Sequence, residues 1–321
     1  MKAAFVTAYG GSDVIKLKEV DRPSPGKGEV LVGIHSTAVT AGDARLRGLD
    51  VPFGFKTMVR LMFGWSRPRR PIMGWCFAGR VEALGPETEG PEIGTAVMGI
   101  AGPKGGAHAE YIALPAARVV PMPTGLSMDE GAAFFFGGLT AQYFLMEQAG
   151  LQKGERVLIN GATGSVGSAA IEMAKAVGAH VTAVCGAANA ALAKELGADA
   201  VLDYRHDVID GRYDVVMDVI GTLQHQGALP LLEKGGRLIL VTAGLMDMLG
   251  AAVLKRKDGI LRIGGTSPED RNSIENLVRR YEAGEYRPRV GMVLPFADIR
   301  AAHEIASGRH KPGNLVLRMK D

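Results

Sequence analysis

The stretch of this sequence best suited to chemistry is a glycine-rich turn that joins an apolar strand to a helix of small residues. A backbone that passes through Gly164 can approach a pyrophosphate closely, and Gly167 lets the helix pack tightly on the strand. The helix start adds free N–H groups and a positive dipole end. Ala162 stands where the usual GxGxxG pattern has its first glycine. The pattern predicts a dinucleotide-binding loop, with a tight turn that binds no ligand as the alternative. The expected contacts are Gly161, Ala162, Thr163, Gly164, Ser165, Val166 and Gly167.

The residues after the second strand of such a unit select between the two nicotinamide dinucleotides. NAD-preferring sites place Asp or Glu there, about 20 residues after the loop, to hold the ribose 2′-hydroxyl. Here that point reads Val184-Cys185-Gly186-Ala187-Ala188-Asn189, with no acid before Glu195. No negative charge would repel a 2′-phosphate, so we expect NADPH as the cofactor. NADH stays an alternative because no arginine stands there either. Gly186 and Asn189 are expected cofactor contacts.

A parallel sheet is needed to position this loop, and the sequence predicts one. From Glu155 onward apolar strands alternate with helices. We expect strands at residues 156–160, 180–184, 200–202, 213–219, 237–241 and 260–263, and helices at 165–178, 189–196, 223–232 and 247–256. Such alternation is typical of a doubly wound α/β sheet. The sequence therefore predicts a Rossmann domain over residues 125–265, beginning near a capping box of Ser127 and Glu130.

The first 124 residues have a different texture, with short strands and turns but few helical patterns. Strands are expected at residues 2–7, 14–19, 29–39 and 76–84, each bounded by Gly, Pro or Asp. The tail beyond the sixth parallel strand has no place in that sheet, and two helices and a strand are expected in it, at 274–282, 296–307 and 315–319. We predict a β-rich domain over residues 1–124 that is completed by residues 266–321.

Composition limits the class of protein. The chain has 321 residues, a net charge of +3, and a hydrophobic fraction of 47%, which is ordinary for a globular protein and gives no indication of nucleic-acid binding. Its two cysteines supply neither a disulfide framework nor a four-thiolate zinc site. We find no signal-peptide pattern and no apolar run of transmembrane length. We expect a reduced, cytoplasmic protein.

Motifs along the whole chain together resemble the medium-chain dehydrogenase/reductase superfamily, in its zinc-independent quinone oxidoreductase branch. Their order and spacing, more than any one of them, carry the resemblance. It implies a GroES-like catalytic domain beside the Rossmann domain, and hydride transfer with a nicotinamide cofactor. The matching stretches are Gly28-Glu29-Val30-Leu31-Val32, Gly42-Asp43, Gly74 to Gly79, Gly105 to Tyr111, Gly138-Leu139-Thr140-Ala141, the glycine loop, Leu196-Gly197-Ala198-Asp199 and Lys234-Gly235-Gly236-Arg237.

The resemblance also bears on zinc. Where the zinc alcohol dehydrogenases have a ligand cysteine and a ligand histidine, this chain has Thr40 and Trp75. Neither side chain is a credible Zn²⁺ ligand, so we expect no metal site. Without a Lewis acid, the substrate has to be electrophilic by itself. A small hydrophobic quinone or α,β-unsaturated carbonyl is expected. A zinc-free reductase of activated ketones, or a dinucleotide-binding scaffold or sensor with little turnover, are the alternatives.

Further site residues are implied by position within the resemblance. Thr40 and Asp43 are expected to face the reaction cleft as candidate catalytic residues, with a structural role for Asp43 as the alternative. No proton donor is identified. The expected cofactor contacts outside the loop and second strand are Thr140, Tyr204, Thr242, Ala243 and Asn314.

Two surface features complete the expectations. Residues 51–71 contain five basic and several large apolar residues but no acid. This segment is expected to cover the cleft, or to be an amphipathic segment that makes weak, salt-sensitive contact with a membrane. The strand at 260–263 should form an exposed sheet edge, and its pairing across a two-fold axis predicts a homodimer.

Overall fold

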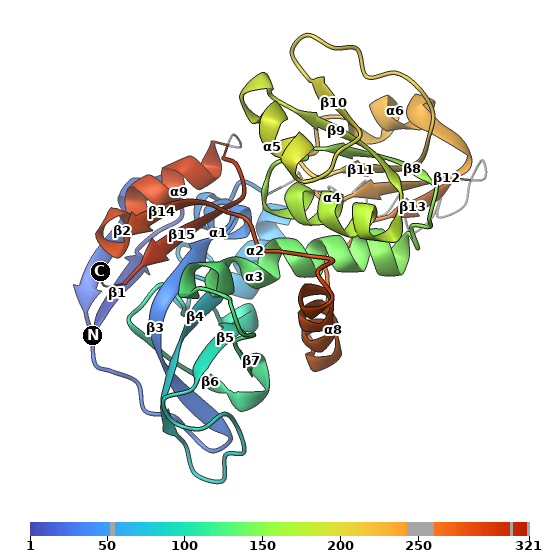
Figure 1. Ribbon diagram of the computed structural model, residues 1–321. Helices are drawn as coiled ribbons and strands as arrows, with labels where there is room; N and C mark the ends of the chain where they lie inside the picture. Colours follow the sequence, from blue (N-terminus) through green and yellow to red (C-terminus); the bar gives the residue numbers. More distant parts are fainter. Residues whose placement is uncertain (52–54, 243–259, 309–310, 320–321) are drawn as a thin grey trace. The chain divides into compact units, whose positions relative to one another are not determined.

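The computed structural model describes residues 1–51, 55–242, 260–308 and 311–319 (Figure 1). These residues form two compact units. Unit 1 comprises Met1–Phe136, Glu269–Glu275 and Pro288–Asp321, and unit 2 comprises Gly137–Pro268 and Asn276–Arg287. The limits differ from the predicted domains 1–124 and 125–265 because two helices are divided between the units. These are α3 (Met128–Ala141) and α8 (Arg271–Glu282).

Unit 1 is built on a seven-stranded sheet in the order β14-β15-β3-β4-β5-β7, with β6 also paired to β3. Strand β3 (Glu29–Val39) is its long central member, and β15 (Asn314–Arg318) pairs antiparallel with it. Blue and red ribbons lie side by side there in Figure 1, so the tail does return to the N-terminal sheet. The remaining strands are β4 (Cys76–Leu84), β5 (Ala96–Ile100), β6 (Tyr111–Pro115), β7 (Val119–Pro121) and β14 (Val290–Pro295), with a separate hairpin of β1 (Lys2–Val6) and β2 (Ile15–Glu19).

Helices of unit 1 lie in the chain between β3 and β4 and between β14 and β15. Helix α1 (Ala41–Gly48) follows β3 directly, and α2 (Phe55–Phe63) follows α1. Helix α9 (Ile299–Ser307) packs Ile299, Ala302 and Ala306 into an apolar core shared with β1 and β15. The sequence patterns predicted neither α1 nor α2.

Unit 2 confirms the predicted doubly wound fold. All strands are parallel, in the order β10-β9-β8-β11-β12-β13, so the order turns back beside β8, the strand that precedes the glycine loop. Ligands of such sheets bind at the carboxyl ends of the strands at this point. The strands are β8 (Arg156–Asn160), β9 (His180–Cys185), β10 (Ala200–Asp203), β11 (Tyr213–Asp218), β12 (Leu232–Leu240) and β13 (Leu261–Ile263).

The helices of unit 2 agree with expectation except after β11. Helices α4 (Ser165–Val177) and α5 (Ala190–Glu195) lie where helices are expected. The helix expected at 223–232 is only α6 (Gln224–Ala228), since Pro230 lies in a short 3₁₀ turn and strand β12 already begins at Leu232. The expected helix at 247–256 lies outside the described residues.

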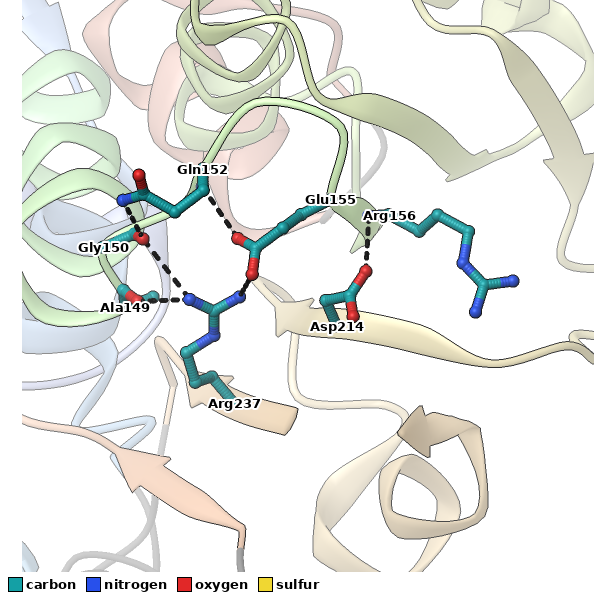
Figure 2. Close-up of polar contacts among 7 residues, drawn as sticks. All are labelled: Ala149, Gly150, Gln152, Glu155, Arg156, Asp214 and Arg237. Atoms are coloured by element: carbon teal, nitrogen blue, oxygen red, sulfur yellow. Dashed lines mark hydrogen bonds and ion pairs between the residues drawn. The ribbon is translucent and has the colours of Figure 1, made fainter. Parts of the chain in front are cut away.

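A network of polar contacts fixes the amino ends of the strands in unit 2, opposite the edge where ligands bind (Figure 2). The Arg237 guanidinium donates to Ala149 O at 2.8 Å and to Glu155 Oε1 at 2.5 Å. The other Glu155 oxygen accepts the Gln152 N–H, and Arg156 N–H donates to Asp214. The turn before β8 is thereby held to β11 and β12.

No helix among the described residues is both long and apolar enough to cross a membrane.

Candidate functional site

Two glycines of the loop in unit 2 have different roles: packing requires glycine at 167, whereas the space beside Gly164 is open. A Cβ on Gly167 would lie 2.3 Å from Gly161 O, so helix α4 can approach the loop only with glycine there. A Cβ on Gly164 would meet nothing nearer than Gly161 O at 3.7 Å, although its φ of −76° suits any residue. Packing within the protein therefore does not require glycine at 164. The absence of a side chain there leaves room on the side of the loop where a pyrophosphate would lie.

The amino end of α4 is available to an anion. Gly164 is its N-cap and supplies no side-chain acceptor to the first turn. The first intrahelical bond runs from Ser168 N–H to Gly164 O at 2.9 Å. N–H groups ahead of it point out of the helix, and the dipole favours negative charge there. The uncapped start suits a phosphate.

Thr140 lies in a helix that packs against this loop within unit 2. A Cβ on Gly137, one turn before Thr140, would lie 2.2 Å from Ser165 O, so the α3 backbone touches the start of α4. Thr140 is 9% exposed. Its role as a cofactor contact stays a prediction.

A buried polar network lies at the carboxyl ends of β8 and β11. Asn160 Nδ2 donates to Asp218 Oδ1 at 2.9 Å and to Thr222 Oγ1 at 2.8 Å. Asp218 also accepts the N–H groups of Gly221 and Leu223. Sequence reasoning missed Asn160 and Asp218, although a polar residue that ends a buried strand marks each one. The network shapes the turn that faces the loop.

Thr242, predicted from its place after the fifth strand, carries a buried hydroxyl oxygen with no hydrogen-bond partner among the described residues. It packs close to Gly221, where a Cβ would lie 2.5 Å from Thr242 Oγ1. A buried hydroxyl at a ligand edge is satisfied when a ligand supplies the missing partner. Ala243, predicted beside it, lies outside the described residues.

The end of the second strand brings Gly186 and Tyr204 together. A Cβ on Gly186 would touch the Tyr204 ring at 3.4 Å, and the Arg205 guanidinium lies over that ring, 5.4 Å from its centroid. Asn189 is half-buried and donates its N–H to Gly186 O. Arg205 was missed, because it follows the third strand and reaches the second only through the parallel pairing of β9 with β10. Its guanidinium thus places a positive charge near the end of the second strand.

In unit 1, Thr40 and Asp43 bind each other at the start of α1. The Thr40 hydroxyl donates to Asp43 Oδ2 at 2.6 Å and accepts the Asp43 N–H at 3.1 Å. Asp43 also accepts the N–H groups of Thr40 and Gly74. Both side chains are buried. These contacts give the pair a positioning role, and their predicted catalytic role stays a prediction.

Two further residues of unit 1 lie just before and at the start of β15. Lys311 Nζ lies 3.5 Å from Val39 O; burial lowers its pKa from 10.5 to about 8, while the Asp43 carboxylate acts in the opposite direction. Asn314 is buried in unit 1 and its side chain donates to Arg289 O at 3.0 Å. The sequence did not single out Lys311, and its predicted neighbour Asn314 stays a candidate cofactor contact.

The residues at the implied zinc positions do not fit a zinc ion. The Thr40 hydroxyl keeps its proton in a bond to Asp43 and accepts the Asp43 N–H, and the Trp75 indole has only an N–H donor. Cys76 is buried, and burial raises the pKa of its thiol well above the usual value, which disfavours the thiolate that zinc needs. Over the described ranges, no group of three or more His, Cys, Asp or Glu side chains is placed to hold a metal ion.

Comparison with known proteins gives matches in both units. Residues 26–124 match the family model described as alcohol dehydrogenase GroES-like domain, and residues 196–317 match the one described as zinc-binding dehydrogenase. The chain is 32% identical over 269 residues to a chloroplastic quinone oxidoreductase of Triphysaria versicolor, with 79% of each chain covered.

Comparison with solved structures gives matches over nearly the whole chain. A quinone oxidoreductase from Coxiella burnetii superposes with a TM-score of 0.87 at 26% identity, covering 100% of this chain and 99% of that one. A mycobacterial protein solved in complex with NADPH superposes with a TM-score of 0.81 at 25% identity, with 99% of both chains covered.

Proposed function

Since this chain belongs to the medium-chain dehydrogenase/reductase superfamily, in its quinone oxidoreductase-like branch, and is an oxidoreductase, we propose that it uses NADPH to reduce a quinone or an α,β-unsaturated carbonyl without zinc. The observation that carries this proposal is the donor set around Thr40. The hydroxyl there is hydrogen-bonded to Asp43, and neither the Trp75 indole nor the protonated thiol of Cys76 is a suitable zinc ligand. A substrate that needs a Lewis acid is poorly served by such a site.

The cofactor part of the proposal rests on unit 2. The open side of Gly164 and the uncapped start of α4 suit a pyrophosphate, and Thr242 offers at the same edge a hydroxyl that has no partner among the described residues. Arg205 over Tyr204 gives a positive charge beside Gly186, which favours a 2′-phosphate and hence NADPH. The NADPH complex of the mycobacterial protein supports the same choice.

Bound NADPH supplies a hydride. In an enone the hydride reaches the β-carbon, the C=C π electrons move toward the carbonyl, and a proton is needed at the α-carbon; a quinone takes a hydride and a proton to become a hydroquinone. This chain's contribution on the acceptor side is a proton and a rigid frame. Lys311 is our candidate donor, since its Nζ lies 3.5 Å from Val39 O, beside the Thr40–Asp43 pair, and a lysine whose burial lowers its pKa to about 8 exchanges its proton readily near neutral pH.

In this proposal, Thr40 and Asp43 are positioning residues. Their reciprocal bonds fix the first turn of α1, and the Asp43 bond to Gly74 N–H at 3.1 Å joins that turn to the segment before β4. Geometry held in advance lowers the entropic cost of reaching the reactive arrangement.

A panel of electron acceptors tests the proposal. NADPH oxidation is measured with quinones, enals, activated ketones and simple ketones, in the presence and absence of a chelator. We expect turnover with quinones or enals that the chelator leaves unchanged. Turnover confined to ketones would favour the activated-ketone alternative, and NADPH binding without turnover of any acceptor would favour a scaffold or sensor.

A further inference from the structure

Unit 1 contains a cavity that the dinucleotide site does not account for. It has a volume of about 360 Å³, within the range of small-molecule sites. Its wall is formed by α1, by α2 and the segment that follows it, by the segment before β4, and by the turn at Pro103 to Gly105. All these residues belong to unit 1.

The floor of this cavity is apolar. Met73 and Pro68 are buried, and Leu46, Phe63, Ile72 and Trp75 are half-buried around them. Apolar side chains that keep part of their surface open to a concave site gain free energy when an apolar ligand covers them, at about 25 cal/mol per Å². The floor therefore suits a hydrocarbon chain or ring.

The rim of the cavity is cationic. Arg69, Arg70 and Lys104 are exposed and line it. Among the ion pairs of the described residues, none involves these three side chains. Three cations without carboxylate partners around one opening favour an anion there.

We propose that this cavity binds an apolar molecule with an anionic end, such as an acyl-chain carboxylate, and that the acceptor reduced by this chain is of that class. The second half rests on the proposed function. It is supported by the floor residues Met73 and Trp75, which flank Gly74, the residue bonded to Asp43 at 3.1 Å. The cavity thus borders the Thr40–Asp43 pair, which we propose positions the acceptor.

The competing occupant of this region is a membrane surface. Met58, Leu61 and Trp65 are exposed apolar residues of α2 and its following turn, and a lipid surface would cover them. The cavity favours a small molecule instead, because it encloses about 360 Å³ and is lined by both the apolar floor residues and the three rim cations. A bilayer would reach the rim and leave the floor uncovered.

The chain has only two tryptophans, Trp65 and Trp75, which makes binding directly observable. In a Trp65→Phe background, the emission of Trp75 reports on the cavity floor. Titration with dodecanoate below its aggregation concentration should shift this emission saturably, and dodecanol should bind more weakly.

Arg69→Gln with Arg70→Gln should weaken dodecanoate binding about tenfold or more, as expected for a lost charge-assisted hydrogen bond, and leave dodecanol binding unchanged. Arg67→Gln is the matched control, since Arg67 lies in the same segment but does not line the cavity.

Equal affinity for the acid and the alcohol, or equal losses in the rim and control variants, would overturn the proposal. So would a response to anionic phospholipid vesicles alone. Far-UV circular dichroism and NADPH titration of each variant show whether the fold and the dinucleotide site persist.

A second arm separates this inference from the proposed function. An enal with a terminal carboxylate is compared with its methyl ester, and kcat/KM should favour the acid in the parent and lose that preference in the rim variant. If dodecanoate binds but no quinone or enal is reduced, the proposed function fails and the cavity assignment stands. Reduction of quinones with no preference for the acid leaves the function standing and contradicts the acceptor class.

Discussion

The ring of His303 stands edge-on to the ring of His108, with centroids 5.4 Å apart and planes at 86°. Both side chains are buried in unit 1. His108 Nε2 lies 3.2 Å from Ala38 O, whereas neither ring nitrogen of His303 has a hydrogen-bond partner in the described structure. Burial lowers the pKa of His303 from 6.5 to about 2, with His108 and Arg47 acting in the same direction. The folded protein therefore holds His303 neutral.

Acid should destabilise the protein through His303. Between pH 6.5 and about 2 the unfolded chain takes up a proton on this residue and the folded chain does not, so the stability present above pH 6.5 is lost as the pH falls. From pH 7.5 to pH 5 this amounts to about 2 kcal/mol of unfolding free energy. Urea denaturation of His303→Leu should show a correspondingly weaker pH dependence. The exposed His206→Leu is the control, and a parent-like pH profile in His303→Leu contradicts the prediction.

NADPH should bind at least about tenfold more tightly than NADH, a preference of about 1.4 kcal/mol. No acid ends the second strand, and Arg205 lies over Tyr204 beside Gly186. Arg205→Ala should remove most of the preference by weakening NADPH binding alone. Cofactor fluorescence titration measures both affinities, with the exposed Lys194→Ala as the control for lost surface charge. An equal loss of affinity for NADPH and NADH would show that Arg205 does not contact the 2′-phosphate.

Gly164→Asp should abolish dinucleotide binding in a folded protein. The backbone φ of −76° accepts any residue and the added Cβ meets open space, so the cost falls on the ligand, through bulk and negative charge beside its phosphates. Gly167→Ala serves as the contrast. Its Cβ would lie 2.3 Å from Gly161 O, and we expect a lower melting temperature. Calorimetry and cofactor titration of both variants separate the two effects, and unchanged NADPH affinity in folded Gly164→Asp rejects the loop as the site.

Activity should survive metal removal. The Thr40 hydroxyl, the Trp75 indole and the high-pKa thiol of Cys76 do not fit a zinc ion. Elemental analysis of the purified protein and assays after dialysis against a chelator test this. One zinc per chain, with activity that disappears on chelation and returns with zinc, would refute it.

We predict a homodimer formed through β13. This strand pairs with β12 on one side, and no other strand of the described chain pairs with its second side. Edge-to-edge pairing with a second copy would satisfy its backbone groups. Sedimentation at micromolar concentration should give about twice the 33.9 kDa chain mass. A single species at the chain mass contradicts the prediction. Leu261→Pro, checked for NADPH binding, should shift the dimer to monomer.

Periodicity and turn residues predicted the local elements well. The predicted strands 29–39, 76–84 and 156–160 have the same bounds as β3, β4 and β8. The capping box of Ser127 is present, since the Ser127 N–H donates to Glu130 Oε2 at 2.9 Å and the Glu130 N–H donates to Ser127 Oγ at 3.3 Å. These features depend on neighbours in sequence, which explains the agreement. The helix at 223–232 was wrong because Pro230 was overlooked as a helix terminator.

Residues whose role depends on distant neighbours were harder to find. Arg205 comes near the second strand only through the pairing of β10 with β9, and Lys311 reaches its proposed place through its approach to Val39. Neither relationship is encoded in local spacing. Asn160 and Asp218 end adjacent buried strands, so a search for polar strand ends would have identified both.

The pairing of Leu315 with Val39 gives the chain an inherent order of assembly during synthesis. Every strand of the parallel sheet in unit 2 leaves the ribosome before β15 does. Because domains fold as units while translation proceeds, the nucleotide-binding half can be complete while β3 still lacks its neighbour. Until the last strand emerges, nascent β3 exposes an open edge, and long-range pairing of this kind is slow to form. A stop codon shortly before β15 would therefore leave the nucleotide-binding half intact and make the N-terminal sheet prone to aggregation.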